Sequence, residues 1–578
     1  MNQTRVFLLL AWMAVAALLW MEWGKFTAPK EAAAPVATAI APAADATVPT
    51  ASAQATAVPE ATLPSVPAAN ADSTVPTLEP VTQPAPVAPI AGTVTVTTDV
   101  LRVVLDGGNL LQADLLKYPQ SKAIGSAPVR LFANDAEHYY VAQSGWINTG
   151  GNAPNHLGGF VPEQAGELAL AEGGGEVVAR FVWNGPDGVS IRRSYTFKRG
   201  QYVVDVRDEI ANTGGAAWQG QVYRQLVRKP PVVETGFTHP ESFSFRGAAW
   251  YSPEEGYDRR KFDKYLNDGK LDLVVQQGWI AMLQHHFFSA WIPRGEDKIV
   301  VSLDAPAGGA QALVRELGPA IAVSPGQQAD SEARLWVGPK LVEQMQAQNV
   351  PGLLRAVDYS QFKIFAVIAE GLFWVLGKLH GLFGNWGWAI IGLVVLLKLA
   401  LFPLSNAQYK SAAKMRKFQP RMQQLKERYG DDRAKYQQAL MELYKKEKIN
   451  PMAGCLPVIP QVIIFMALYW MLAESVELRQ APWTLWIQDM TARDPFFILP
   501  VLNVAIMFFT QKLTPMVGMD PMQQKMMQFM PLAFGAILAF LPAGLVLYQV
   551  ANGGLGLLQQ WYMLRKHGEP AKKAEVAK

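Results

Sequence analysis

The chain has 578 residues, and half of them are apolar whereas only 17% are charged. Soluble domains have about 25% charged residues, so this composition favours a membrane protein and excludes a small secreted toxin. The net charge of +4 is too small for a general nucleic-acid binder, and the single cysteine, Cys455, excludes a disulfide framework and a cysteine-rich metal site.

The N-terminus carries one basic residue, Arg5, followed by an apolar run over residues 6–20. Such a run is either the hydrophobic region of a cleavable signal peptide or an uncleaved membrane anchor of about 20 residues. The anchor is favoured because Trp20 and Trp23 stand where interfacial aromatic residues occur. We therefore expect an anchor over residues 1–26, and either interpretation places the following segment outside the cytoplasm.

Residues 27–92 consist mainly of Ala, Pro, Thr and Val and hold 12 of the 40 prolines. A segment with so few large apolar groups cannot bury enough surface to offset the entropy of ordering its backbone. It is predicted to be a disordered periplasmic tether.

Short alternating segments, separated by glycine clusters, fill residues 93–348; examples are residues 177–183, 191–197 and 202–210. Alternation with a period of two between glycine-rich turns is typical of antiparallel strands, so the region predicts a large all-β sandwich. The adjacent residues His285 and His286 would point to opposite faces of a strand and could not hold a metal together. The other histidines of the region stand alone, and we expect no catalytic residue there: His138, His156 and His239.

Apolar residues recur at helical spacing over residues 349–385, but Lys363, Glu370, Lys378 and His380 interrupt them. The uncharged runs between these residues are far shorter than the roughly 20 residues that a membrane span needs. We expect an amphipathic helix that lies in the membrane interface.

Five apolar segments follow, and each is predicted to span the membrane: residues 386–404, 455–472, 495–511, 526–541 and 543–564. With the anchor they give six membrane spans beside the large periplasmic all-β domain. Residues 406–450 carry a net charge of +7 and residues 565–578 one of +3, so the positive-inside rule places both segments, and hence both termini, in the cytoplasm. The loops at residues 473–494 and 512–525 are then periplasmic and cytoplasmic, respectively.

Residues 405–454 are predicted to form an antiparallel helical hairpin, because apolar residues recur at spacings of three and four on either side of Gly430. Its basic face either only sets the topology and touches anionic lipid, or docks ribosomal RNA or an emerging chain. The docking candidates are basic side chains of the first helix: Lys410, Lys414, Arg416, Lys417, Arg421, Lys426 and Arg428.

Lys398 is the only ionisable residue well inside any of the five later spans. A charge at the membrane centre costs about 2.5 to 3.5 kcal/mol on insertion scales, so something must offset that cost. Either the side chain extends to the cytoplasmic interface, or it faces a water-filled cavity where it attracts an acidic group in transit.

Polar and small residues recur on one face of the last span, at positions 549, 552, 556 and 559. Such stripes more often pack helices together than line a cavity. Combined with a lone lysine and short spans, they favour one wet concavity that opens to the cytoplasm. Its candidate lining is Lys398, Gln461, Asn503, Gln549, Asn552 and Gln559.

The sequence has no nucleotide-binding loop, no metal-binding motif and no acidic residue within any of the five later spans. These absences argue against an ATP-driven pump, a zinc protease and a proton-coupled carrier. The same features are compatible with two functions: a solute channel or carrier with a carbohydrate-binding β-domain, and a membrane-anchored sugar-modifying enzyme.

Several short motifs in the last 200 residues carry a specific resemblance. They are Lys398 with Phe402-Pro403-Leu404, Ala407-Gln408-Tyr409, Lys414-Met415, Asn450-Pro451, Gly454-Cys455-Leu456-Pro457, Ser475-Val476-Glu477-Leu478-Arg479, Asp520-Pro521-Met522-Gln523-Gln524-Lys525 and Pro542-Ala543-Gly544-Leu545-Val546-Leu547-Tyr548. With the overall layout they make the chain similar to the YidC/Oxa/Alb family of membrane protein insertases, in its Gram-negative form, over essentially the full length.

The resemblance implies a periplasmic supersandwich of galactose-mutarotase type and a five-helix core with a hydrophilic groove that is closed to the periplasm. It assigns the groove's positive charge, usually an arginine, to Lys398, and a hydrophobic slide to Phe465, Tyr469, Ile537 and Tyr548. The implied function is to insert nascent inner-membrane proteins and help them fold, alone or with the Sec translocon. The ribosome and anionic lipids are further expected partners, whereas no cofactor, metal or small-molecule substrate is expected.

Overall fold

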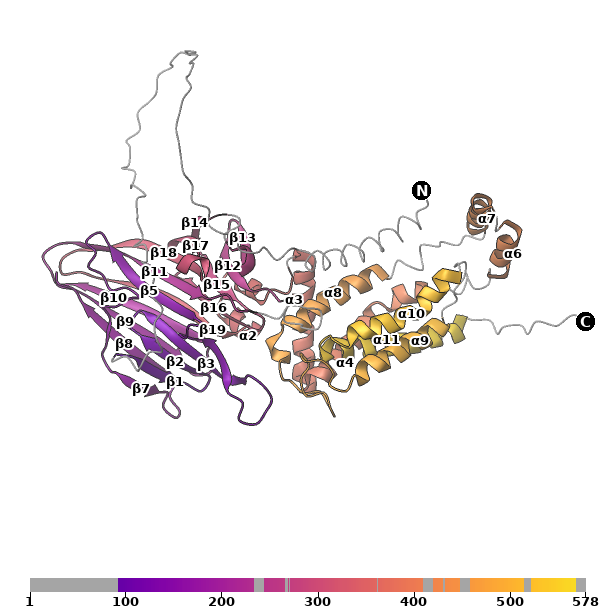
Figure 1. Cartoon of the computed structure of the whole chain (residues 1–578), viewed down its shortest axis with the longest axis horizontal. Coiled ribbons are helices and arrows are strands. Elements are labelled where there is room, and N and C mark those ends of the chain that lie inside the picture. Colours follow the sequence, from indigo (N-terminus) through magenta and orange to yellow (C-terminus); the bar gives the residue numbers. More distant parts are fainter. Residues whose placement is uncertain are drawn as a thin grey trace, which may run out of the picture. The chain divides into compact units, whose positions relative to one another are not determined.

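The computed structural model describes residues 92–232, 244–265, 269, 271–360, 362–408, 419–429, 432–446, 458–513 and 521–567 (Figure 1). The predicted anchor, nearly all of the predicted tether and most of the C-terminal tail lie outside these residues, as does His239. The described residues form a β-domain and a helical part.

The β-domain consists of two sheets with ten and nine strands, and nearly all neighbouring strands are antiparallel. The period of two in the sequence is the cause: along β9 (Val189–Lys198) every second residue is buried, from Val189 to Phe197. Large side chains such as Trp146 and Trp291 fill the space between the sheets, where each indole donates a hydrogen bond to the opposite sheet. The predicted large β-sandwich is confirmed.

The first sheet contains β1 (Val94–Thr97), β2 (Leu101–Asp106), β3 (Asn109–Pro119), β4 (Pro128–Phe132), β5 (Tyr140–Asn148), β7 (Gly166–Ala169), β11 (Trp218–Arg228), β14 (Asp272–Gln276), β17 (Lys298–Asp304) and β18 (Ala312–Val323). The second contains β6 (Val161–Pro162), β8 (Glu176–Asn184), β9, β10 (Val203–Asn212), β12 (Gly247–Ser252), β13 (Gly256–Lys261), β15 (Trp279–Leu283), β16 (Phe287–Pro293) and β19 (Gln328–Pro339). The predicted strands at residues 177–183, 191–197 and 202–210 correspond to β8, β9 and β10.

Two buried carboxylates of the β-domain interior are each held by an arginine. Asp208 accepts hydrogen bonds from Arg193 at 2.6 and 2.7 Å and one from the indole of Trp146, on the opposite sheet. Glu316 lies 2.9 Å from Arg224. Both acids are thus engaged in buried ion pairs that link strands, which is a structural arrangement.

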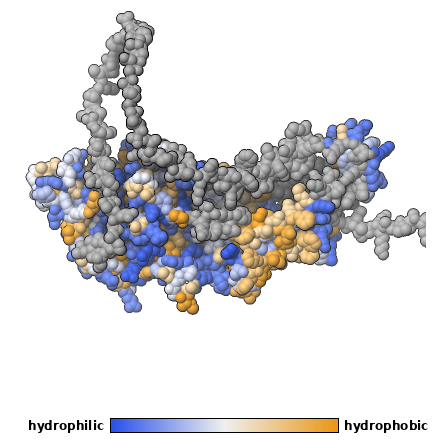
Figure 2. Space-filling model, viewed as in Figure 1, coloured by the Kyte–Doolittle hydropathy of each residue, from blue (hydrophilic) through white to orange (hydrophobic). Residues whose placement is uncertain are grey.

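The helical part follows the short helix α2 (Val342–Ala347). Its helices are α3 (Lys363–Phe383), α4 (Trp386–Ala400), α6 (Gln419–Tyr429), α7 (Arg433–Lys446), α8 (Val458–Glu474), α9 (Ile498–Leu513), α10 (Pro521–Leu538) and α11 (Ala543–His567). Helix α3 packs against α4 and α8, α11 packs against α4, α8 and α9, and α10 packs against α9. Apolar residues gather on the surface of this part, whereas the β-domain surface is mainly hydrophilic (Figure 2).

Helix α3 alone is long and apolar enough, among the described helices, to cross a membrane by itself. One face, which includes Ala369, Leu372 and Leu376, is buried, but Val367 and Trp374 on other faces are exposed and also apolar. The interfacial position predicted for residues 349–385 therefore stays a prediction, and so does the number of six spans.

Helix α4 ends at Ala400 and meets the next helix, Phe402–Gln408, at an angle of 60°. Pro403 explains the break, because it cannot donate a backbone hydrogen bond to Leu399 and its ring clashes with the preceding turn. The predicted span over residues 386–404 is therefore a straight helix of 15 residues followed by a bend.

The loop after α8 holds the starts of three helices. Asn385 caps α4 by accepting hydrogen bonds from the amides of Gly387 and Trp388, and its own amide donates to the loop carbonyls of Pro482 and Trp483 at 3.1 Å. Asp494 caps α9 by accepting a bond from the amide of Leu499 at 2.7 Å. Backbone bonds from Ala543 to Ala492 and from Gly544 to Met490 tie the start of α11 to the same loop.

Candidate functional site

Lys398 lies in the last turn of α4 and its side chain reaches α11. A Cβ atom placed on Gly556 of α11 would lie 3.3 Å from the Lys398 Nζ atom, so the ammonium group rests against bare backbone. The residue is half-buried, and no acidic side chain of the described residues forms an ion pair with it. The negative end of the α4 dipole favours a cation in this last turn and offsets part of the cost of the charge.

Asn503 of α9 approaches the same face of α11 one turn away. Its side chain is 3% exposed, and its Oδ1 atom lies 4.0 Å from the position of a Cβ atom on Gly553. Gly553 and Gly556 are three residues apart, about 4.5 Å along the helix axis. The absence of side chains at these two positions is what lets the lysine and the asparagine approach α11.

Gln559 follows Gly556 by three residues, and its Nε2 atom is buried without a hydrogen-bond partner. We call Lys398, Asn503, Gly553, Gly556 and Gln559 the Lys398 cluster. The sequence predicted Lys398, Asn503 and Gln559 as groove residues and placed Gly556 on the polar and small stripe of the last span. Gly553 was missed because the stripe of alternating spacings on α11 passes through Asn552, although the run Asn552-Gly553-Gly554 could have indicated a close helix contact.

The other predicted groove residues take different positions. Gln549 and Asn552 are half-buried on α11, and Gln461 is exposed on α8. No contact joins these three amides to Lys398 in the part of the chain that is described, so their place in a common groove stays a prediction.

The predicted slide residues divide into two groups. Phe465 of α8 stacks on Tyr548 of α11 with ring centroids 6.4 Å apart, and Tyr548 is only 3% exposed. Tyr548 therefore contributes to the packing of α8 on α11, and a client could touch it only if these helices separate. Ile537 of α10 is 42% exposed, and Tyr469 lies near the end of α8.

The described parts of the predicted helical hairpin, α6 and α7, pack on each other. Met422 is 4% exposed and its sulfur accepts a hydrogen bond from Tyr444 at 3.8 Å, as the predicted apolar seam requires. Arg421 and Arg428 are exposed on α6. The remaining docking candidates, Lys410, Lys414, Arg416 and Lys417 together with the side chain of Lys426, lie outside the described residues.

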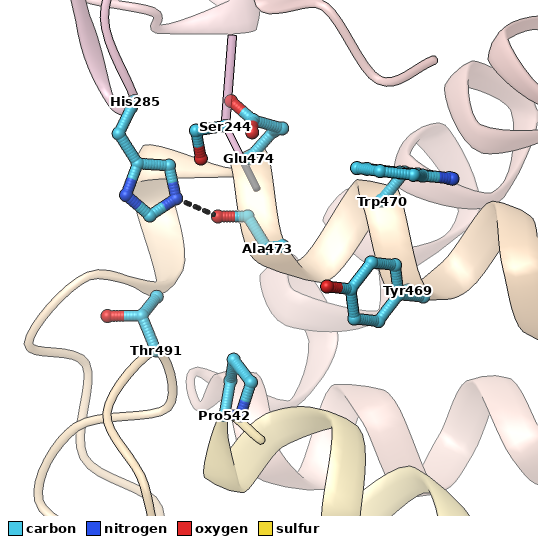
Figure 3. Close-up of a pocket in the computed structure, with 8 residues that line it drawn as sticks. All are labelled: Ser244, His285, Tyr469, Trp470, Ala473, Glu474, Thr491 and Pro542. Atoms are coloured by element: carbon cyan, nitrogen blue, oxygen red, sulfur yellow. Dashed lines mark hydrogen bonds between the residues drawn. The ribbon is translucent and has the colours of Figure 1, made fainter. Parts of the chain in front are cut away.

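A small pocket lies where the β-domain meets the end of α8 (Figure 3). Nε2 of His285 donates a hydrogen bond at 2.8 Å to the carbonyl oxygen of Ala473, and the rings of Tyr469 and Trp470 form another wall. The prediction that His285 and His286 point to opposite faces of a strand was wrong. Both residues lie in the turn between β15 and β16, and their rings stack 3.7 Å apart.

Two lone histidines of the β-domain, His138 and His156, have polar partners. His138 is exposed and pairs with Asp135, and Nδ1 of His156 lies 2.6 Å from the hydroxyl of Tyr223. Burial lowers the pKa of His156 to about 4, so its ring is neutral at physiological pH. Across the described ranges, no group of three or more His, Cys, Asp or Glu residues is placed to hold a metal ion.

Two families match the chain in adjoining regions. The 60Kd inner membrane protein family matches residues 378–570, and the YidC periplasmic domain family matches residues 93–375. The chain is 58% identical over 577 residues to the membrane protein insertase YidC of Xanthomonas campestris pv. campestris (strain 8004), which covers 99% of each chain. It is 56% identical over 582 residues to that of Stenotrophomonas maltophilia (strain R551-3), which covers 100% of this chain and 99% of the relative.

Solved structures show weaker similarity. A crystal structure described as an active YidC insertase with the first transmembrane domain resolved is 20% identical, covers 81% of this chain and 92% of that chain, and gives a TM-score of 0.37. A galactose mutarotase-like protein from Lactobacillus casei ATCC 334 is 10% identical, covers 43% of this chain and all of that chain, and gives a TM-score of 0.29. The assignment rests on the sequence relatives.

These relatives decide between the functions that the sequence left open. Both match the chain over nearly its full length and both are named insertases, so the protein is neither a sugar-modifying enzyme nor a solute carrier. Its clients are membrane proteins, and the β-domain is the periplasmic domain of an inner-membrane protein. The chain belongs to the YidC family of membrane protein insertases.

Proposed function

We propose that the protein inserts its clients through a hydrophilic groove that opens only to the cytoplasm, with Lys398 as the landing site for the acidic flank of a client. The flank enters the groove, pairs with the ammonium group and is drawn part of the way across the membrane. Pairing lowers the cost of taking a carboxylate out of water. The adjoining apolar segment then moves into the lipid.

The position of Lys398 is the observation that supports this proposal most directly. Its ammonium group lies against Gly556, without an acidic partner among the described residues, and Asn503 approaches the neighbouring Gly553 on the same helix. A half-buried cation that only served packing would be expected to have a fixed counter-ion. The acidic flank of a client would supply this counter-ion when it enters the groove.

Lysine in place of arginine changes how the landing site works. An ammonium group is a point charge with rotatable donors, whereas a guanidinium group binds a carboxylate through two parallel hydrogen bonds. The site therefore recognises negative charge rather than one geometry, and arginine should replace lysine without loss.

Apolar surface supplies the free energy of the later step. Several side chains of α10 are apolar and exposed, among them Met526 at 63% and Phe529 at 67%. With Ile537 and Phe465 they form the proposed slide between the groove and the lipid. Transfer of about 20 apolar residues out of water releases far more free energy than the groove has to supply, so no nucleotide is required.

The other parts of the proposal concern topology and partners. Six spans with both termini in the cytoplasm place the basic hairpin where chains emerge from the ribosome. Arg421, Arg428 and the neighbouring basic residues would contact the ribosome or anionic lipid, and the Sec translocon would share larger clients. Net positive charge on residues 406–450 supports this assignment.

The proposal is tested with proteoliposomes that contain only the purified protein and a short single-span client with an acidic N-terminal tail. Wild type is compared with Lys398→Arg and Lys398→Met, because methionine keeps the apolar stem and removes the charge. We expect Lys398→Arg to insert the client as wild type does and Lys398→Met to insert it about ten-fold more slowly, which corresponds to about 1.4 kcal/mol.

A client whose acidic tail residues are changed to amides is the matched control, and Lys398→Met should insert it at the wild-type rate. Equal insertion into protein-free liposomes would contradict the proposal that this protein inserts the client. Equal loss with both clients would show that Lys398 supports packing and does not receive the acidic flank.

A further inference from the structure

We propose that Gln511 is a positioning residue that holds α10 on a fixed course against α9 by filling the hydrogen-bond gap left by Pro531. This inference rests on the proposed role of α10 as a slide for clients. It assigns to one polar side chain the task of keeping that slide in place.

Pro531 lies inside α10 and has no backbone N–H, so the carbonyl of Met527, four residues earlier, lacks its helical donor. Gln511, near the end of α9, donates a hydrogen bond from Nε2 to this carbonyl oxygen at 2.6 Å. A backbone carbonyl without a donor is unfavourable where neighbouring side chains shield it from water, and Met527 is half-buried. The bond from Gln511 therefore meets a need that the proline creates.

The helices around Pro403 and Pro531 follow different courses, and the difference supports this role. At Pro403 the chain bends by 60° and α4 ends at Ala400. At Pro531 the helix continues from Pro521 to Leu538. Pro531 leaves the carbonyl of Met527 without its helical donor, and Gln511 of the neighbouring helix α9 donates to that carbonyl. No such bond is seen at Pro403 among the described residues.

A second contact between α10 and α9 fixes the orientation of α10. A Cβ atom on Gly535 would lie only 2.1 Å from Val504 Cγ2, so α10 touches α9 closely there. The two contacts are eight residues apart on α10 and seven apart on α9, about 12 and 10.5 Å, as two antiparallel helices lying alongside each other require. Either contact alone would leave α10 free to swing about it.

The bond also determines where the exposed apolar side chains point. Met526, Phe529 and Met530 lie within one turn of Met527 and are 63%, 67% and 47% exposed. If α10 bent at Pro531, the direction of this surface relative to the rest of α10 would vary. Gln511 is thus placed to give a client one continuous apolar surface.

The test is a double-mutant cycle of Gln511→Met and Pro531→Ala, since alanine restores the missing N–H and makes the glutamine unnecessary. Helix positions are measured by electron spin resonance between labels on Phe509→Cys and Phe529→Cys, with Cys455→Ser, and insertion is measured with unlabelled protein. We expect Gln511→Met alone to broaden the distance distribution and slow insertion about three-fold or more. On the Pro531→Ala background, the same substitution should change neither measurement.

An equal effect of Gln511→Met on both backgrounds, or failure to fold on both, would show a packing role and overturn the proposal. No effect on the wild-type background would overturn it as well. If the distances respond but insertion does not, the bond does not guide clients and the proposed role fails. The distance measurement needs no client, so it separates failure of this inference from failure of the Lys398 mechanism.

Discussion

A glycine, and not a partner side chain, stands opposite the ammonium group of Lys398. The position is sterically tight, because a methyl group at Gly556 would lie 3.3 Å from Nζ. The neighbouring atom is Nζ at the end of the flexible Lys398 side chain, and it can shift by a few tenths of an ångström. A small side chain is therefore tolerated, whereas a branched one would occupy the place of the ammonium group.

We expect Gly556→Val to slow insertion of an acidic-tailed client about as much as Lys398→Met does, roughly ten-fold or 1.4 kcal/mol, because it moves the charge away from its site. Gly556→Ala should keep most of the activity. The rates are measured in the same proteoliposomes. A loss with Gly556→Val that is equally large for the client with a neutral tail would mean that the valine disturbs helix packing instead.

Sequence patterns predicted the polar face of α11 better than the neighbours of that face. The spacing of Gln549, Asn552, Gly556 and Gln559 needs only helical geometry, and Gly556 does face Lys398. Exposure of Gln461 and burial of Tyr548 depend on which helix lies beside them. A single sequence contains no information of that kind, because many helix arrangements satisfy the same pattern.

The start of α4 depends on Asn385, which joins two elements through one side chain. Its Oδ1 caps the helix and its Nδ2 binds the loop carbonyls of Pro482 and Trp483. The Gly384-Asn385 pair indicates a helix boundary in the sequence. The second bond could not be predicted, since its acceptors lie almost a hundred residues later.

Asn385→Ala should destabilise the first turn of α4 by about 1 kcal/mol, so the amides of Gly387 and Trp388 should exchange with solvent about five-fold faster. Asn385→Ser keeps a capping oxygen but cannot reach the loop, and it should leave these amides protected. Hydrogen exchange measured by mass spectrometry distinguishes the two. Fast exchange in both variants would show that the contact with the loop, and not the cap, protects the helix start.

The ends of the predicted membrane spans show what composition cannot predict. Each of the five predicted later spans coincides with a helix, yet the span predicted over residues 386–404 continues past Ala400, where α4 ends. Hydropathy averages over a window and cannot register one missing hydrogen bond. The bend at Pro403 and the continuity at Pro531 follow from local hydrogen bonds instead, and only the structure gives the donor at Pro531.

At the scale of the whole molecule, the β-domain and the helices meet through buried charges. Lys340, which follows β19, lies 3.3 Å from Glu474 at the end of α8, and both side chains are at most 3% exposed. Arg479 donates to the carbonyl of Pro119 at the end of β3. The sequence predicted the two parts but not this junction, because its partners lie more than a hundred residues apart.

Glu477 is the titratable group at this junction that responds near neutral pH. It lies in the 3-10 helix Val476–Leu478, it accepts a hydrogen bond from the amide of Val342, and burial raises its pKa to about 7. Other titratable groups near it include Tyr118, Tyr359, Arg479 and Glu474. Because its carboxyl group ionises more readily in the unfolded chain, with a pKa near 4.5, the contribution of Glu477 to folding stability falls as pH rises towards 7 and then levels off.

Glu477→Gln should remove this dependence, so the stability of the variant relative to wild type should rise between pH 5 and 8 by up to about 3 kcal/mol. Thermal unfolding of both proteins in detergent, at a series of pH values, measures the difference.

Burial lowers the pKa of His156 and His286, which destabilises the fold on acidification, but these contributions are common to both proteins and cancel. Glu343→Gln, at an exposed position on α2, is the control and should follow wild type at every pH. A constant difference between Glu477→Gln and wild type across this range would mean that the carboxyl group stays in one protonation state and that the junction does not respond to periplasmic pH.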